Sequence, residues 1–218
     1  MSKYNVISFS GGRTSAYMIH RIQAMVSQGL IDNVKYVFMD TGAEHPKTYE
    51  FIRQVVKHFD IDLVCLRAVM TTEVGIGPKY KEVCIDDICA DYGPWKEMIK
   101  CYSTPTVKMP MCTDRMKTAP YLKYCNDTFG RNNYTTWLGM RIDEPKRIKA
   151  QKGFRYLAEI SPMDKQDILG WWKEQSFDLG IEEWLGNCVF CIKKGVNKIA
   201  LAAIDEPELA ADFWDMLN

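Results

Sequence analysis

The feature that most constrains the fold is a strand, a Ser-Gly turn and a helix that follow one another within residues 4–28. The apolar, β-branched run Tyr4–Phe9 predicts a buried strand, and Ser10-Gly11-Gly12 interrupts it sharply. Apolar residues then recur at helical spacing over Thr14–Gln28. Flexible glycine backbone followed by the free N–H groups of a helix start is typical of an anion site.

Two common phosphate-binding motifs are absent from this turn. Neither G-x-x-x-x-G-K-[ST] nor G-x-G-x-x-G is present, so the turn is neither a Walker loop nor a dinucleotide fingerprint. On its own, the turn is also compatible with an ordinary strand-to-helix connection. If it binds phosphate, the candidate residues are Ser8, Ser10, Gly11, Gly12, Arg13, Thr14 and Ser15.

Length and composition suit a globular protein with a substantial core. The 218 residues fit one α/β domain with elaborations, and 47% of them are hydrophobic. No apolar run approaches the roughly 20 residues of a membrane helix, and no basic segment followed by an apolar one begins the sequence. We therefore expect a cytoplasmic protein without a membrane partner.

The formal net charge is zero, but the charges are distributed unevenly. Residues 100–155 contain 12 Lys and Arg against 4 Asp and Glu, whereas residues 156–218 contain 5 against 12. A basic middle segment suits a phosphorylated ligand or a nucleic-acid strand. It is equally compatible with a solvated face balanced by the acidic tail.

A second polar turn follows the next expected strand. The run Asn33–Asp40 reads as a strand, and Asp40-Thr41-Gly42 follows it, before a helix that Pro46 opens. Ligands of open α/β sheets bind beyond the carboxyl ends of strands, so we expect this turn and Ser10-Gly11-Gly12 to border one crevice. The alternative for Asp40 is a turn-forming or helix-capping carboxylate.

Cysteines point to metal binding or redox chemistry. Eight cysteines in a cytoplasmic chain are unsuited to structural disulfides, and Cys188 and Cys191 form the sole C-x-x-C pair. This spacing lets two thiolates reach one metal, but closing a tetrahedral site requires further ligands. Zinc, a Cys188–Cys191 disulfide and unrelated buried thiols remain alternatives.

The remaining segments are expected to elaborate the sheet. Residues 71–110 are rich in Gly, Pro and charge, and we read them as an insertion over the active site with short helices at 85–91 and 94–100. Strands are expected at 61–70, 134–140 and 154–160, and a helix at 165–175. The tail 196–218 predicts one or two amphipathic helices that cover the sheet or form a homodimer contact.

Five motifs in order resemble the adenine nucleotide α-hydrolase superfamily, which contains the PP-loop ATP pyrophosphatases and the PAPS reductases. The Ser10–Ser15 loop resembles S-G-G-x-[DT]-S, with Arg13 where Lys is usual and Thr14 where Asp is common. The run Asp40–Tyr49 resembles D-T-G-x-E-x-P-x-T-Y, and Cys112–Pro120 resembles C-T-x-x-x-K-x-x-P. The run Gly139–Arg147 resembles G-x-R-x-[DE]-[ES]-x-x-R, and the C-x-x-C pair follows at 188–191.

The resemblance implies a HUP-like, Rossmann-like α/β fold: a twisted, mostly parallel five-stranded sheet with helices on both faces. It implies one nucleotide-binding domain over 1–218, with the insertion at about 71–110 and a cysteine-containing helical part at about 186–218. Arg115 and Lys117 become candidate phosphate contacts. Nucleotide-binding residues extend to Asp40, Thr41 and Gly139.

The resemblance also implies the chemistry of the site. Candidate catalytic residues are Arg13, Arg141, Arg147 and Cys112. Candidate ligands of a [4Fe–4S] cluster, or of zinc, are Cys112, Cys188, Cys191 and Cys101. Mg²⁺ would bridge the phosphate oxygens of the nucleotide.

The favoured prediction is an enzyme that binds ATP, cleaves it at the α phosphate and couples this to sulfur transfer onto a nucleic acid such as tRNA or DNA, or onto a nucleotide. A sulfur donor or a thiol reductant protein is an expected partner. The alternative is a PAPS reductase-like enzyme, although no E-C-G-x-H segment follows Cys191. A non-catalytic nucleotide-binding regulatory module is a third reading, because Arg13 and Thr14 alter the loop.

Overall fold

The computed structural model describes residues 3–73 and 75–217. Residues 1–2, 74 and 218, which fall within the predicted domain, its insertion and its C-terminal part, lie outside the described residues. The chain forms two compact units. The first comprises Met1–Phe38, Glu50–Val64 and Cys125–Leu179, and the second comprises Met39–Tyr49, Cys65–Tyr124 and Gly180–Asn218. The prediction of a single domain stays a prediction.

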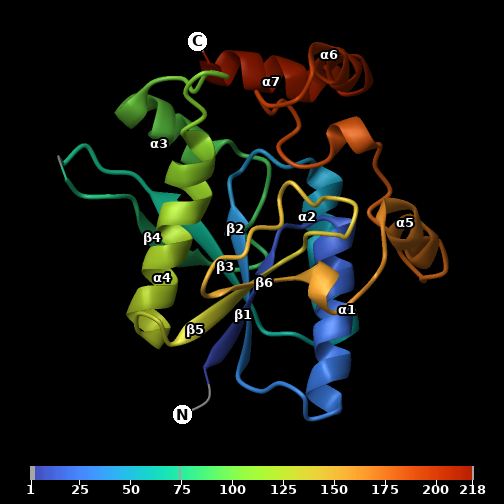
Figure 1. Ribbon diagram of the computed structural model, residues 1–218. Coiled ribbons are helices and arrows are strands. Elements are labelled where there is room, and N and C mark those ends of the chain that lie inside the picture. Colours follow the sequence, from blue (N-terminus) through green and yellow to red (C-terminus); the bar gives the residue numbers. More distant parts are fainter. Residues whose placement is uncertain (1–2, 74, 218) are drawn as a thin grey trace. The chain divides into compact units, whose positions relative to one another are not determined.

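Strands and helices alternate along most of the chain (Figure 1). The strands are β1 (Tyr4–Phe9), β2 (Val34–Asp40), β3 (Leu63–Val69), β4 (Lys79–Val83), β5 (Tyr134–Leu138) and β6 (Phe154–Tyr156). The α-helices are α1 (Arg13–Ser27), α2 (Pro46–Phe59), α3 (Gly93–Tyr102), α4 (Ala119–Phe129), α5 (Lys165–Lys173), α6 (Val196–Asp205) and α7 (Pro207–Leu217). A π-helical turn, η1 (Asp114–Thr118), precedes α4, and 3₁₀ turns form η2 (Leu157–Glu159) and η3 (Glu183–Leu185).

The sheet confirms the predicted mostly parallel α/β class. Its order among the described strands is β4-β3-β2-β1-β5-β6. Strand β1 pairs in parallel with β2 and β5, and β5 pairs in parallel with β6. Strand β4 pairs antiparallel with β3, from Cys65 opposite Val83 to Val69 opposite Lys79. The sheet therefore has six strands rather than the expected five.

The sixth strand comes from the predicted insertion, where the helix expected at 85–91 was wrong. Residues 85–87 form a turn, and the strand lies just before it at 79–83. The sequence Lys-Tyr-Lys-Glu-Val is charged and largely exposed, which is typical of an edge strand protected against further pairing. The strand expected at 154–160 was too long, because the chain enters η2 after Tyr156.

Helices of the first unit cover its strands through buried apolar faces. The side chains of Ile19 and Ile22 on α1, and of Ile7 on β1, are fully buried. Figure 1 shows α1 on one side of β1 and the end of α4 on the other. At that end, the Phe129 ring lies 4.7 Å from the Tyr4 ring. This packing fixes the start of α1 directly after the carboxyl end of β1.

In the part of the chain that the structure describes, no helix combines the length and the apolar character needed to cross a membrane. The two amphipathic helices predicted for the tail are α6 and α7.

Candidate functional site

The Ser-Gly turn of the first unit forms a narrow loop that opens helix α1. Gly11 adopts the left-handed conformation, with φ of 76°, and Gly12 is the extended residue that begins the helix. No side chain caps this helix start, and its first turn carries no acidic residue. The backbone N–H groups and the positive end of the helix dipole are therefore suited to an anion.

Two serine hydroxyl groups hold the loop closed upon itself. The Oγ atom of Ser15 donates to the carbonyl oxygen of Gly12 at 3.0 Å and accepts from the backbone N–H of Ser10 at 3.1 Å. It also lies 2.9 Å from the Oγ atom of Ser10. Ser15 thus sets the shape of the loop, whereas Ser8 lies half-buried inside β1, opposite Val37 of β2.

Gly139, which directly follows β5, lets the backbone of β5 pass close to this loop. A Cβ atom at Gly139 would lie 3.1 Å from the Cα atom of Ser15 and 3.3 Å from its Cβ atom. A Cβ atom at Gly12 would meet only the Oγ atom of Ser10, at 3.7 Å, which is an ordinary contact. The space above Gly12 is therefore open, whereas the space at Gly139 is filled by the loop itself.

Arg13 is held by a carboxylate that sequence reasoning missed. Its Nε and Nη2 atoms donate to the two carboxylate oxygens of Asp178, at 2.6 and 2.7 Å. Burial opposes the ionised form of Asp178, but the hydrogen bonds from Arg13 and from the Leu179 N–H bring its pKa below the usual range. The indole N–H of Trp172 on α5 donates to the Arg13 carbonyl oxygen at 2.9 Å.

Arg141 reaches the same loop from the turn that follows Gly139. Its Nη1 atom donates to the Thr14 hydroxyl oxygen at 3.1 Å, and its Nε and Nη2 atoms donate to Asp143 at 2.8 and 3.1 Å. The Arg141 hydrogen bonds lower the pKa of Asp143. Arg147 pairs with Glu144 and is largely exposed. The structure therefore brings Arg13, Thr14 and Arg141 together at one loop, with Arg147 held in the following turn.

The Asp40 turn belongs to the second unit and has a different character. The Asp40 carboxylate is fully buried and accepts three hydrogen bonds: from Arg67 at 2.6 Å, from the Gly42 N–H at 2.9 Å and from the Tyr49 hydroxyl at 3.0 Å. Burial raises the pKa of Asp40, and these donors act against that rise. The Asp40 side chain therefore orders the turn from inside the protein.

Arg67 extends this network to the insertion. Its Nη1 atom donates to Asp91 at 2.6 Å, so one guanidinium joins two carboxylates. Burial lowers the pKa of Arg67, but Asp91 and Asp40 more than reverse this effect, so the guanidinium stays charged. Asp91 also accepts from the N–H of Gly93, which starts α3.

Gly42 is required where these segments meet. Its φ is 69°, and a Cβ atom there would lie 2.6 Å from the Oδ1 atom of Asp91 and 3.1 Å from the backbone nitrogen of Tyr92. The Tyr92 N–H donates to the Gly42 carbonyl oxygen at 2.9 Å. The glycine of the D-T-G sequence therefore serves close packing of the backbone in this unit.

A half-buried cysteine and a buried carboxylate lie side by side beyond this turn. The Sγ atom of Cys188 lies 3.7 Å from the Glu44 Oε1 atom and 3.7 Å from the Thr41 hydroxyl oxygen. Lys117, a predicted phosphate contact, instead donates to Glu44 Oε1 at 3.2 Å. The Glu44 Oε2 atom is buried without a hydrogen-bond partner in the described structure. Burial and the Glu44 charge raise the pKa of Cys188 to about 12.

The four predicted metal ligands are only partly brought together. Cys112 is buried in an apolar cluster with Met98 and Met116, and Cys188 packs against that cluster. Cys191 lies in the turn after Cys188, where its N–H donates to the Cys188 carbonyl oxygen, and Cys101 is half-buried in α3. Within residues 3–73 and 75–217, no three His, Cys, Asp or Glu side chains are arranged to hold a metal ion. Ligation of a [4Fe–4S] cluster or of a zinc ion by these cysteines therefore stays a prediction.

Several residues of these two sites could not be recognised from sequence. The ion-pair partners of the predicted residues were missed: Asp178 for Arg13, Asp143 for Arg141, Glu144 for Arg147 and Arg67 for Asp40. Asp178 lies 165 positions from Arg13 in a segment without a recognisable motif. Only Asp143 and Glu144, which lie inside the matched arginine motif, carried a signal that could have been used.

Comparison with protein families identifies the kind of domain. The family model for the phosphoadenosine phosphosulfate reductase domain matches residues 4–175. The chain belongs to this family. The match includes the loop, the Asp40 turn, the Cys112 segment and the arginine motif. The C-x-x-C pair and helices α6 and α7 follow the matched region.

The chain is similar to a phage protein in sequence and to two solved structures in its fold. The chain is 51% identical over 217 residues to the nin region protein ORF290 of Escherichia phage lambda, covering 98% of this chain and 74% of that protein. A phosphoadenylyl-sulfate reductase from Candida auris is similar in structure, with 13% identity, 78% and 71% coverage of the two chains and a TM-score of 0.44. An NH₃-dependent NAD synthetase from Campylobacter jejuni has 15% identity, 100% and 84% coverage and a TM-score of 0.47.

Proposed function

We propose that this member of the phosphoadenosine phosphosulfate reductase domain family binds ATP through the Ser10–Ser15 loop and cleaves it at the α phosphate. The observation that carries this proposal is the uncapped start of α1, where the space above Gly12 is open. Two guanidinium groups lie at this helix start: that of Arg13, and that of Arg141, which donates to the Thr14 hydroxyl oxygen. Backbone donors and planar cations of this kind stabilise charge that develops on phosphate oxygens.

In the proposed step, an oxygen of the acceptor attacks the α phosphorus, the bond to the β-phosphate oxygen breaks and pyrophosphate leaves. The acceptor oxygen is then adenylylated and can depart with AMP. Loop N–H groups would hold the phosphates of ATP, and Arg13 and Arg141 would balance the charge on the reacting phosphate. Arg147 would balance the charge on the leaving pyrophosphate. Mg²⁺ bound together with the nucleotide would supply positive charge that stabilises the leaving pyrophosphate, a role that needs few protein ligands.

Sulfur transfer is the finer part of the proposal. A sulfur nucleophile would attack the carbon that bears the adenylylated oxygen, in a tRNA or DNA base or in a nucleotide. A C–S bond forms, the C–O bond breaks and the oxygen leaves as part of AMP. The basic composition of residues 100–155 supports a nucleic-acid acceptor. The candidate ligands Cys112, Cys188 and Cys191 would hold the iron–sulfur cluster that the motif resemblance implies, and this cluster would supply sulfur. Near-equal amounts of iron and acid-labile sulfide in anaerobically purified protein support this ligand set, and the absence of both contradicts it.

The experiment that tests the nucleotide site compares Gly12→Val with Gly170→Val. Extended backbone at Gly12 accepts valine, so the side chain should fill the phosphate approach without blocking folding. We expect Mg·ATP affinity, measured by calorimetry, to fall at least about tenfold, and AMP formation to fall with it. Gly170 lies on α5 with nothing within 4 Å of its Cβ position, so its variant should bind as the wild type does. Unchanged ATP affinity in Gly12→Val contradicts the loop assignment.

Sulfonucleotide reduction is the second candidate, and the family match favours it. Such a reaction needs a reactive thiolate, whereas the half-buried Cys188 has its pKa raised to about 12 by desolvation and by the Glu44 charge. Sulfite release from PAPS with a thiol reductant, in the absence of AMP formation from ATP, would select this candidate. Tight nucleotide binding without turnover of either substrate would instead select a regulatory module.

A further inference from the structure

A second cavity lies in the first unit, at the opposite edge of its strands from the Ser-Gly loop. It has a volume of about 480 Å³, and helix α1, the start of β2 and the turn at 60–62 line it. The loop follows the carboxyl end of β1, whereas this cavity lies at the amino end of the parallel neighbour β2. A strand of six residues separates the two edges by roughly 20 Å, so a ligand here would not occupy the nucleotide site.

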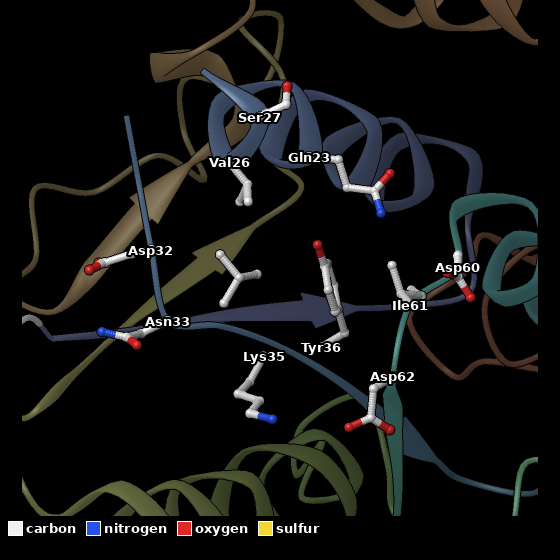
Figure 2. Close-up of a pocket in the computed structure, with 11 residues that line it drawn as sticks. Gln23, Val26, Ser27, Asp32, Asn33, Lys35, Tyr36, Asp60, Ile61 and Asp62 are labelled. Carbon is white, nitrogen blue, oxygen red and sulfur yellow. The ribbon is translucent and has the colours of Figure 1, made fainter. Parts of the chain in front are cut away.

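Tyr36 carries a polar group into this cavity. Figure 2 shows its ring rising from β2 with the hydroxyl directed toward Gln23 and Val26 of α1. The residue is only 8% exposed, and no hydrogen bond to its hydroxyl is found among the described residues. Burial raises the pKa of Tyr36 to about 12, so the phenol is neutral. The Tyr36 hydroxyl is not among the buried polar atoms that lack a partner, so it is open to the cavity, where a ligand can reach it.

The walls around Tyr36 are apolar and the rim is acidic. Val26 and Ile61 approach the ring from α1 and from the turn (Figure 2), and Val34 precedes Tyr36 by two residues on the same strand face. Three rim side chains are acidic and exposed: Asp32, Asp60 and Asp62. Lys35 is the sole cation among the eleven lining residues, all of them described, and its side chain points away from the Tyr36 hydroxyl.

We propose that this cavity binds a small amphipathic cation, an amine attached to a flat apolar body. The flat body would pack between Val26, Ile61 and the Tyr36 ring. The ammonium group would donate to the Tyr36 hydroxyl oxygen and face the acidic rim. Acidic side chains outnumber basic ones by two in the lining, so the rim attracts a cation. The cavity volume lies within the range of small-molecule sites.

Benzylamine is a suitable probe, because it combines one ammonium group with a flat ring. In an NMR titration of the full chain, we expect saturable shifts at the amides of Gln23, Tyr36 and Ile61, with a dissociation constant on the order of 1 mM. Benzyl alcohol, which has the ring without the charge, should bind about tenfold more weakly. Agmatine, which has charge without a ring, should also be weaker. Equal binding of all three overturns the proposed ligand class.

Two variants separate loss of the ligand from loss of the fold. Val26→Trp should fill the cavity and abolish the benzylamine shifts, and it should fold because Val26 is 42% exposed. Leu30→Trp, at a position 64% exposed and outside the lining, should bind benzylamine normally. Tyr36→Phe should weaken binding about fivefold. Absence of saturable shifts in the wild type up to about 10 mM benzylamine, or full binding by Val26→Trp, contradicts the proposal.

Discussion

Arginine–carboxylate pairs occur in both units, but the two pairs differ in exposure. In the first unit, Arg13 and Asp178 have side chains that are 20% and 34% exposed. In the second unit, Arg67 and Asp40 are 12% and 0% exposed. The distances are the same, 2.6 Å, so the pairs differ in their surroundings rather than in their contact.

This difference separates a replaceable pair from a structural one. An anion arriving at the start of α1 can exchange with Asp178 for the Arg13 guanidinium, because water screens and replaces both partners. Asp40 cannot be exchanged in this way, because its removal leaves Arg67 charged and partly desolvated. The first unit therefore has charged groups available to an anion, and the second uses the same groups to hold its segments together.

The largest expected effect concerns the thiol group of Cys188, which lies beside the Glu44 carboxylate in the second unit. With a pKa of about 12, only about one part in ten thousand is thiolate at pH 8, against about a quarter for an ordinary exposed cysteine. We expect iodoacetamide to label Cys188 about a thousandfold more slowly than Cys84, which is exposed, as followed by peptide mass spectrometry. The expected difference shrinks above pH 10, as the Cys188 thiolate population rises.

Glu44→Gln is the matched variant for this measurement. Removing the negative charge beside Cys188 lowers the pKa of the thiol, and we expect labelling of Cys188 to become about tenfold faster while Cys84 is unaffected. Labelling of Cys188 at the Cys84 rate in the wild type contradicts the raised pKa of this thiol.

The next largest effect is expected at Gly42 in the second unit. An alanine there combines left-handed backbone with a Cβ atom 2.6 Å from Asp91, so we expect a loss of about 3 kcal/mol in the free energy of unfolding. Gly29→Ala is the control, because its φ is also 69° but nothing lies within 4 Å of the added atom. That variant should lose about 1 kcal/mol. Equal losses in urea denaturation would show that Asp91 moves aside freely.

Sequence reasoning succeeded where a local pattern determines the structure. The β1 strand, the α1 helix and the mostly parallel sheet follow from apolar periodicity and from Gly11-Gly12, because these signals act within a few residues. The edge strand β4 was missed because its residues are charged and lack the apolar pattern of a buried strand. Charged residues on an edge strand prevent it from pairing with strands of other chains.

The partners within the sites could not be predicted in the same way. Motifs identified Arg13 and Asp40 as polar residues at strand ends, but Asp178 and Arg67 come from segments without motifs. Whether a charged residue faces a ligand or a buried partner depends on these distant residues. The residue assignments for nucleotide and metal binding accordingly stay predictions.

Gly139 tests the first unit at a site where binding should change more than stability. In Gly139→Ala the new methyl group meets Ser15 at 3.1–3.3 Å and should displace the loop by a few tenths of an ångström. Because Ser15 sets the loop shape through Ser10 and Gly12, we expect ATP affinity to fall about tenfold with at most about 1 kcal/mol of lost stability. Gly170→Ala, in open space on α5, should change neither quantity. A loss of stability without loss of affinity would assign Gly139 to packing alone.

The smallest effect, and the most direct test of the exchangeable pair, is expected for Asp178→Asn. The variant frees Arg13 for a phosphate, so ATP affinity should rise about threefold, while stability at pH 7 should fall by about 0.5 kcal/mol because the pair is partly exposed. The folded-state pKa of Asp178 is lowered, so its contribution is present above the unfolded pKa near about 4 and is lost as pH falls through the folded value. Wild type and variant should therefore converge in stability once the pH falls below the folded-state pKa of Asp178. Reduced ATP affinity in the variant would instead mean that Asp178 orients Arg13 toward the nucleotide, which would make this pair as structural as the one between Arg67 and Asp40.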